Sequence, residues 1–173
     1  NLQTLKEKYQ TVYVIGFSMG GMIAAYLAAK YEVDKLVLLA PAGKFISLKQ
    51  WTVDIAEALI DRFKGKINDN QLYIQFKEKA GTVPIRANFE FIKLVMYTRK
   101  YLEKVEIPVL IAQGQRDRMV PAKTVYFLDK KIASKQKQLV LFDRSRHQLC
   151  LGDDKDTLNQ IVYDFLLAEK VNQ

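Results

Sequence analysis

The sequence has little that could bind a metal or form a cross-link. Its 173 residues include one cysteine, Cys150, and one histidine, His147. A single cysteine excludes an internal disulfide and is typical of a reducing compartment, so we expect a cytoplasmic protein. Zinc and transition-metal sites draw on several cysteine and histidine side chains, and we therefore expect no metal site.

Long hydrophobic runs and basic blocks are also absent. No apolar run approaches the roughly 20 residues that span a bilayer, and no stretch has the form of a signal peptide, so we expect no stable membrane insertion. The formal charge is +8, but the lysines are scattered along helical stretches and form no basic block with interleaved aromatics. This distribution is typical of solvated helix faces and argues against nucleic-acid binding.

Short aliphatic runs alternate with helical patterns along most of the chain. This alternation predicts an α/β fold, a parallel sheet covered by helices. The predicted strands are residues 12–15, 36–39, 109–112 and 139–142. The predicted helices beside them are residues 2–9, 19–31, 122–132 and 157–169. Residues 36–39 are apolar on both faces, as in an interior parallel strand.

The middle of the chain breaks this alternation, because residues 46–102 contain helical patterns and no strand. Apolar residues at spacings of three and four predict a first helix through Trp51 to Phe63, another helix begins near Asn68, and a third covers about residues 87–102. We therefore predict three regions: a core segment 1–45, a helical cap with its return helix 46–102, and a core segment 103–173.

The motif Gly16-Phe17-Ser18-Met19-Gly20 matches G-x-S-x-G between a predicted strand and a predicted helix. Such a turn exposes the serine hydroxyl, which requires a strained backbone at Ser18, and the flanking glycines let the helix pass close to the strand. A P-loop would need Gly-Lys-Ser/Thr here, and a dinucleotide fingerprint would need glycine in place of Ser18. Ser18 is therefore a candidate nucleophile.

A serine hydroxyl needs a base to act as a nucleophile at neutral pH. His147 is the only histidine available, and it lies in a polar turn after the last predicted strand. Asp117, in a loop after the strand 109–112, is the candidate acid that would hold the imidazole. The chain order Ser, Asp, His is the order found with G-x-S-x-G nucleophiles.

Three other aspartates compete with Asp117 for the role of the acid. Asp143 precedes the histidine too closely in sequence. Asp153 and Asp154 are better explained as caps of the last helix. We therefore predict Asp117 as the third member of the triad.

The segments GFSMGG, GQRDRMVP and HQLCLGDDKDTLNQIVYDFL together resemble small bacterial carboxylesterases and monoacylglycerol-lipase-like enzymes of the α/β-hydrolase fold. The resemblance covers essentially all 173 residues and is weakest in the helical middle. It implies a short helical cap at residues 46–102, small-molecule esters of short or medium acyl chains as substrates, and no cofactor. Carried over by position, Ser18, Asp117 and His147 keep their roles, although Arg146 replaces the glycine that usually precedes the histidine.

The resemblance also implies that this chain is the C-terminal part of the fold. The full sheet has about eight strands, whereas four are predicted here, so we expect some 70–80 further residues on the N-terminal side, on the usual αβ spacing. The backbone N–H of Met19 would supply one oxyanion donor, and the loop that supplies the second is not in this sequence. We therefore expect the strand 12–15 to be an open edge and the chain alone to be inactive or nearly so.

Phe17 and Trp51 are candidate substrate-binding residues. Trp51 would line an acyl pocket with Ile55, Leu59 and Phe63, or these side chains would pack the cap onto the core. Cys150 is expected to be a small buried apolar group. Two other functions stay open: a non-catalytic ligand-binding protein of the same fold, and a hydrolase of amide or carbon–carbon bonds with the same triad.

Overall fold

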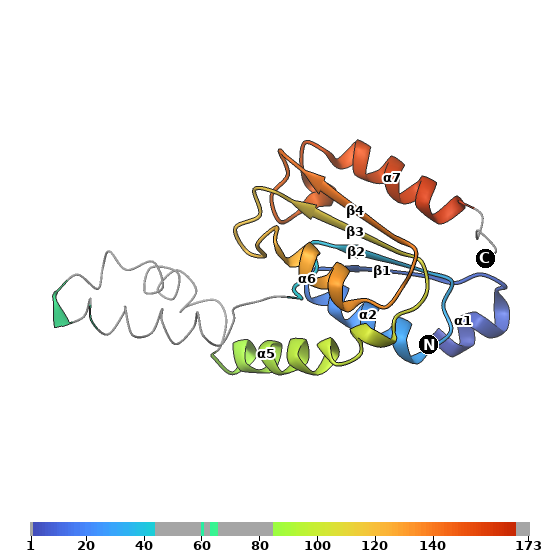
Figure 1. The fold of residues 1–173 in the computed structure, drawn as a ribbon, viewed down its shortest axis with the longest axis horizontal. Helices are drawn as coiled ribbons and strands as arrows, with labels where there is room; N and C mark the ends of the chain where they lie inside the picture. Colours follow the sequence, from blue (N-terminus) through green and yellow to red (C-terminus); the bar gives the residue numbers. More distant parts are fainter. Residues whose placement is uncertain (1, 44–59, 61–62, 66–84, 169–173) are drawn as a thin grey trace. The chain divides into compact units, whose positions relative to one another are not determined.

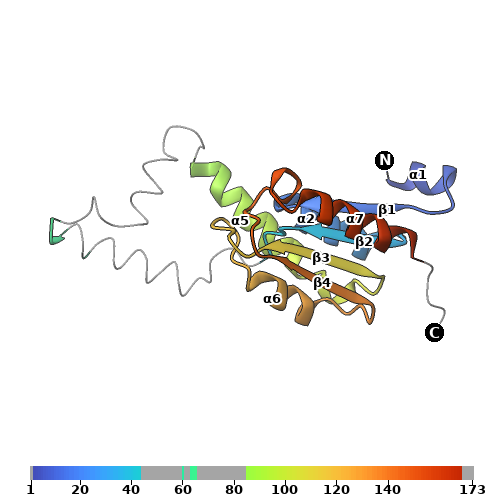
Figure 2. The same cartoon turned by 90° about the horizontal axis from the view of Figure 1, so that it is seen from above.

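Four parallel strands form the centre of the protein in the computed structural model, which describes residues 2–43, 60, 63–65 and 85–168. The strands are β1 (Tyr13–Phe17), β2 (Lys35–Leu39), β3 (Val109–Gly114) and β4 (Lys137–Phe142). They lie in the order β1-β2-β3-β4, and all three pairings are parallel (Figure 2). The four predicted strands and their parallel arrangement are confirmed, with bounds that differ by at most two residues.

The helices lie on both faces of this sheet. Figure 1 shows α7 on one face, with α2 and α6 on the other. The helices are α1 (Leu2–Lys8), α2 (Met19–Lys30), α5 (Ile85–Arg99), α6 (Thr124–Lys131) and α7 (Lys155–Leu167), with short 3-10 helices η2 (Leu102–Lys104) and η3 (Leu149–Leu151). Each of these α-helices coincides with a helix that the sequence predicts.

The core is built on the two inner strands, with helices packed on both of their faces (Figure 1). Every residue of β2 and β3 is buried. Because successive side chains of a strand point to opposite faces, alternate residues such as Val37 and Leu110 join one cluster with Leu158 of α7. Burying each such side chain stabilises the fold by about 1.5–3 kcal/mol. The prediction of a strand apolar on both faces at 36–39 is confirmed.

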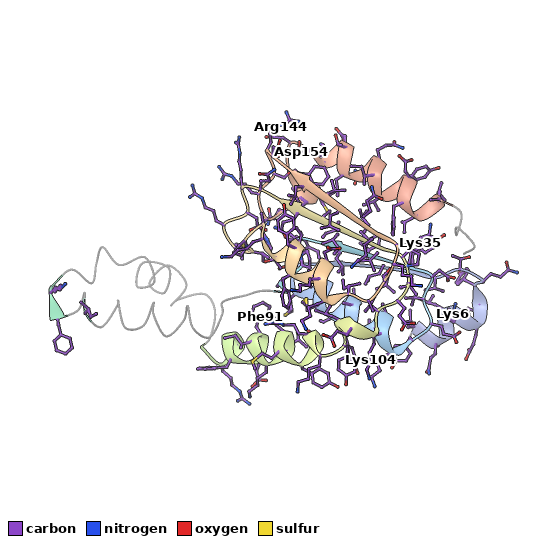
Figure 3. The ribbon with its side chains drawn as sticks, in the orientation of Figure 1. Lys6, Lys35, Phe91, Lys104, Arg144 and Asp154 are labelled. Atoms are coloured by element: carbon purple, nitrogen blue, oxygen red, sulfur yellow. The ribbon has the colours of Figure 1, made fainter. Side chains whose placement is uncertain are left out.

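A buried lysine fixes the end of α7 to the sheet. Lys35, at the start of β2, is 4% exposed, and its ammonium donates to the carbonyl oxygens of Phe165 at 2.7 Å and Leu166 at 3.1 Å (Figure 3). The last carbonyl groups of a helix have no partner within the helix and carry a partial negative charge, so a cation is stabilising there. This contact helps to set the position of α7, which follows the loop that carries His147.

β1 lies at one edge of the sheet and pairs with β2 alone among the described strands. Its side chains Tyr13, Ile15 and Phe17 are exposed, by 38%, 50% and 41%. The predicted open apolar edge at this strand is therefore confirmed for the chain as described.

The helical middle is described in part. The chain divides into two compact units, one of residues 1–44 with 95–173 and the other of residues 45–94. Helix α5 corresponds to the third helix predicted there, whereas Trp51, Ile55 and Leu59 lie outside the described residues. Phe63 is described and is 90% exposed. The three-region division stays a prediction.

None of the described helices combines the length and the hydropathy that crossing a bilayer requires.

Candidate active site

The turn between β1 and α2 presents Ser18 at the C-terminal end of the sheet. Ser18 has φ 52° and ψ −118°, a strained conformation for a residue with a side chain. Its N–H donates to the carbonyl of Leu39 at 2.8 Å, and its carbonyl accepts from the N–H groups of Gly21 and Ala42, both at 3.1 Å. The end of β2 thus holds the turn in place, and the predicted strain at Ser18 is confirmed.

The glycines of the motif do not contribute equally. A Cβ on Gly16 would lie 2.4 Å from the carbonyl oxygen of Gly20 and 2.6 Å from the Cβ of Ala24. A Cβ on Gly20 would meet nothing within 4 Å, and one on Gly21 would approach Pro41 to 3.0 Å. The expectation that both flanking glycines allow close packing is right for Gly16 and wrong for Gly20, because position 20 faces open space.

Asp117 lies in the loop after β3 and its side chain is fully buried. Its Oδ1 accepts from the backbone N–H groups of Met119 at 2.8 Å and Val120 at 2.9 Å. Its Oδ2 accepts from the side-chain amide of Gln113 at 2.7 Å. A buried carboxylate is costly unless hydrogen-bonded, and these donors compensate for the loss of water.

His147 joins the serine and the aspartate. Its Nδ1 lies 2.7 Å from Oδ2 of Asp117, and its Nε2 lies 3.0 Å from Oγ of Ser18, although 129 positions separate the histidine from the serine. A neutral imidazole that donates from Nδ1 to the carboxylate has a free acceptor at Nε2 for the serine hydroxyl. The structure therefore brings the three predicted residues into one hydrogen-bonded series.

The loops that carry Asp117 and His147 are bonded to each other. The N–H of Gln115 donates to the carbonyl of Phe142 at 2.9 Å, and the N–H of Arg116 donates to the carbonyl of Ser145 at 3.1 Å. A Cβ on Gly114 would lie 2.4 Å from that same Ser145 oxygen. Glycine at position 114 is therefore needed for the two loops to lie this close.

Asp154 fixes the histidine loop from the other side. Its carboxylate accepts from the Ser145 hydroxyl at 2.8 Å and from the Arg144 guanidinium at 3.0 Å (Figure 3). The pKa of Asp154 lies below its usual value, mainly because the Ser145 hydroxyl donates a hydrogen bond to its carboxylate. The hydrogen bond and the positive charge of Arg144 lower the pKa further. Asp154 does occupy the N-cap position of α7, but its side chain makes no cap hydrogen bond. The interpretation of Asp154 as a helix cap is thus wrong for its side chain, because the histidine loop binds it instead.

Asp143 and Asp153 are the other two rivals for the acid. Asp143 is exposed and accepts from the side-chain amide of Gln115. Asp153 is exposed. Neither is the carboxylate that contacts His147, which is Asp117.

The remaining predicted residues lie as follows. The ring of Phe17 packs against the imidazole of His147, the candidate base, and the two ring centroids are 5.0 Å apart. Met19 is the first residue of α2, so its N–H has no acceptor within the helix and lies next to Ser18. Cys150 is exposed, which contradicts the expectation of a buried thiol, because in η3 it is the neighbouring Leu149 that packs into the core. Trp51 lies outside the described residues.

Sequence patterns did not identify Gln113 and Asp154 as parts of the site. Gln113 could have been noticed as a polar residue at the end of an otherwise apolar strand. Asp154 gave no such signal, because an aspartate before a helix already has an ordinary explanation as a cap.

The site contains the groups for nucleophilic catalysis. A hydroxyl, an imidazole and a buried carboxylate in series can remove the proton of the hydroxyl and stabilise the resulting imidazolium. Within the described ranges, no group of three or more histidine, cysteine, aspartate or glutamate side chains could hold a metal ion.

The chain is similar to known proteins in sequence and in fold. The model of the family described as serine aminopeptidase, S33, matches residues 2–155. A carboxylesterase of Bacillus subtilis (strain 168) is 23% identical over 163 residues, which cover 92% of this chain and 65% of the relative. A thermostable monoacylglycerol lipase of Bacillus sp. (strain H-257) is 24% identical, with 93% and 64% covered.

A solved structure of the metagenome-derived lipolytic enzymes LipS and LipT superposes with a TM-score of 0.71 at 18% sequence identity. The superposition covers 95% of this chain and 68% of that one. The chain therefore spans about 65% of the length of the curated relatives it matches.

Proposed function

This chain belongs to the family described as serine aminopeptidase, S33, and has the α/β-hydrolase fold that the sequence predicts; we propose that it carries the catalytic centre of a serine hydrolase that cleaves carboxylic esters of short or medium acyl chains. The observation that carries the proposal is the series Asp117–His147–Ser18, with hydrogen-bond distances of 2.7 and 3.0 Å. The names of the relatives, a carboxylesterase and a monoacylglycerol lipase, favour an ester as the substrate.

The reaction proceeds as two acyl transfers. In the first, Nε2 of His147 takes the Ser18 proton as Oγ attacks the ester carbonyl, and the imidazolium then protonates the departing alcohol. In the second, His147 takes a proton from water, which attacks the acyl-enzyme carbonyl; the bond between the acyl group and Oγ then breaks, the imidazolium returns the proton to Oγ of Ser18, and the carboxylic acid is released. Asp117 stabilises the imidazolium through its hydrogen bond to Nδ1.

The negative charge that develops on the carbonyl oxygen needs a donor beside Ser18. The N–H of Met19 is such a donor, since it is the residue after the nucleophile and lies at the positively charged N-terminus of α2. Phe17, 41% exposed beside the imidazole, offers an apolar surface for the substrate. Trp51 stays a proposed contact of the acyl chain.

A matched pair of serine variants tests the proposal. The measurements of activity use the full-length protein, in which the expected N-terminal segment precedes this chain, and this protein is the wild type in every activity assay below. We expect it to hydrolyse a p-nitrophenyl ester and to be labelled by a fluorophosphonate probe, and Ser18→Ala to lose both, with turnover down by about 10⁶-fold as is typical for removal of a serine nucleophile. Ser134→Ala, at a buried serine outside the site, is the control that retains both. Hydrolysis at the wild-type rate by Ser18→Ala would contradict the assignment.

The same assay distinguishes the alternatives. Failure of the full-length wild type to react with the probe and the ester would favour a non-catalytic ligand-binding protein. Faster hydrolysis of the matched p-nitroanilide would favour an amide substrate, which the aminopeptidase description of the family also allows.

A further inference from the structure

We infer that Gln113 is a positioning residue for the candidate acid, because its side-chain amide fixes the rotation of the Asp117 carboxylate so that Oδ2 faces His147. The inference rests on the proposed function, since it gives Gln113 a part in aligning the same three groups. Gln113 would contact neither substrate nor reacting atoms and would act through Asp117.

The contacts of Asp117 divide between its two oxygens. The backbone N–H groups of Met119 and Val120 hold Oδ1, while Oδ2 receives the imidazole and the Gln113 amide. A carboxylate oxygen accepts about two hydrogen bonds, so all four acceptor directions are occupied. The terminal torsion of an aspartate has a broad energy profile, and hydrogen bonds must therefore define its angle.

Gln113 is itself held at a defined place. Its Nε2 donates to Oδ2 of Asp117 at 2.7 Å and also to the carbonyl of Val120 at 3.2 Å. Both partners are acceptors. Rotation of the amide by half a turn would place its oxygen against two other acceptor oxygens, which is unfavourable. The N–H of Val120 also donates to Oδ1 of Asp117. A ring of hydrogen bonds therefore joins Gln113, Asp117 and the backbone of Val120.

A purely structural role does not account for this side chain. Gln113 is fully buried near the end of β3, and its Oε1 has no hydrogen-bond partner among the described residues. Burying an amide oxygen without a partner costs free energy, and an apolar side chain would fill the same space without that cost. What the amide adds is the hydrogen bond to the carboxylate oxygen that binds His147.

If this donor is lost, we expect the orientation of the His147 imidazole to become less well defined. Oδ2 would keep a single hydrogen bond, the carboxylate would turn more freely about Oδ1, and Nε2 would face the Ser18 hydroxyl for a smaller part of the time. Turnover should fall while substrate binding is retained, because Gln113 is buried behind Asp117.

The test compares Gln113→Met with Thr124→Val. Both changes remove a fully buried polar group and nearly conserve volume, but the Thr124 hydroxyl has no partner among the described residues, so it holds nothing in the site. We expect Gln113→Met to lower kcat by about tenfold, far less than the ~10⁴-fold loss when the acid itself is changed, with KM within about twofold. Thr124→Val should leave both constants unchanged.

A second readout does not depend on activity. His147 is the only histidine of the chain, so its Nδ1 proton is identified directly in the NMR spectrum after labelling with [¹⁵N]histidine. We expect this resonance to shift and to exchange faster with water in Gln113→Met, and to stay unchanged in Thr124→Val. Gln113→Leu serves in the same way if the methionine variant does not fold.

Two results would overturn the inference: an unchanged Nδ1 resonance with unchanged kcat in a folded Gln113 variant, or equal losses in the Thr124 control. A full-length wild-type protein that hydrolyses no ester and reacts with no probe would instead contradict the proposed function. The NMR comparison would still decide whether Gln113 aligns Asp117 with His147.

Discussion

Ser18 holds a positive φ of 52°, and the residues around it explain how the chain sustains that strain. The carbonyl of Leu39 and the N–H of Ala42 bond to its backbone, while the absent side chain at Gly16 lets α2 approach β1. At the scale of single residues, the position of the hydroxyl therefore depends on backbone contacts and on one missing Cβ more than on the serine side chain.

The glycines of the motif provide a prediction at this scale. Gly16→Ala should destabilise the fold by about 1–3 kcal/mol, because its Cβ would overlap the Gly20 carbonyl and the Ala24 side chain. Gly20→Ala should be neutral or stabilising by up to about 1 kcal/mol, since the site is open and alanine favours the helix. Urea unfolding of the two variants measures the difference, and equal losses would contradict the packing argument.

At the scale of elements, two loops and the start of one helix form the support of the site. Backbone N–H groups of the loop after β3 donate to carbonyls at the end of β4 and in the loop that follows it, and Asp154 at the start of α7 binds Ser145 in that second loop. The Arg144 side chain is 63% exposed against 11% for Asp154, so water weakens that ion pair. The buried hydroxyl of Ser145 is accordingly the stronger of the two contacts.

Asp154 gives the prediction at this scale, with Asp153 as its matched control. The pKa of Asp154 is lowered, first by the Ser145 hydroxyl and then by Arg144, so its contribution to stability is present above the ordinary aspartate pKa of about 3.9. This contribution is lost as the pH falls through the lowered value. Asp154→Asn should therefore reduce the free energy of unfolding at neutral pH and differ less from wild type as the pH falls.

Urea unfolding at a series of pH values measures this difference, together with ester hydrolysis at neutral pH. Asp154→Asn should reduce turnover because the histidine loop loses its charged partner. The exposed Asp153→Asn variant should match wild type in both measurements. A stability difference that persists unchanged at acid pH would show that the carboxylate charge is not what holds the loop.

For the protein as a whole, the most consequential feature is the exposed edge of the sheet at β1. β1 exposes Tyr13, Ile15 and Phe17, and no described strand pairs with its outer side. An exposed apolar strand edge can pair with another chain. The expected inactivity of the 173-residue chain by itself stays a prediction and depends on the same end of the sheet.

We therefore predict that the 173-residue chain associates with itself as its concentration rises. Ile15→Lys should reduce the association, because a charge on an edge strand opposes pairing. Tyr126→Lys, at an exposed aromatic residue of α6 on another part of the surface, should not. Sedimentation velocity measures the mass relative to the 20.0 kDa monomer, and a monomer at all concentrations would contradict the prediction.

The alternation of strands and helices and the short list of chemical groups can be predicted from the order of the residues. Aliphatic runs such as 36–39 and 109–112 can be recognised locally, because burial on both faces requires apolar residues throughout. Ser18 and His147 were also identifiable, the first from its strand-to-helix context and the second because no other histidine exists.

Which of these groups come into contact depends on how the strands and helices pack together. The 3.0 Å contact between Ser18 and His147 arises because parallel strands bring their C-terminal ends to one edge, a distance that no local pattern encodes. The partners of Gln113 and Asp154, the open space at Gly20 and the exposure of Cys150 likewise depend on which elements pack against them. Local propensity places residues on elements, whereas packing decides what each side chain touches.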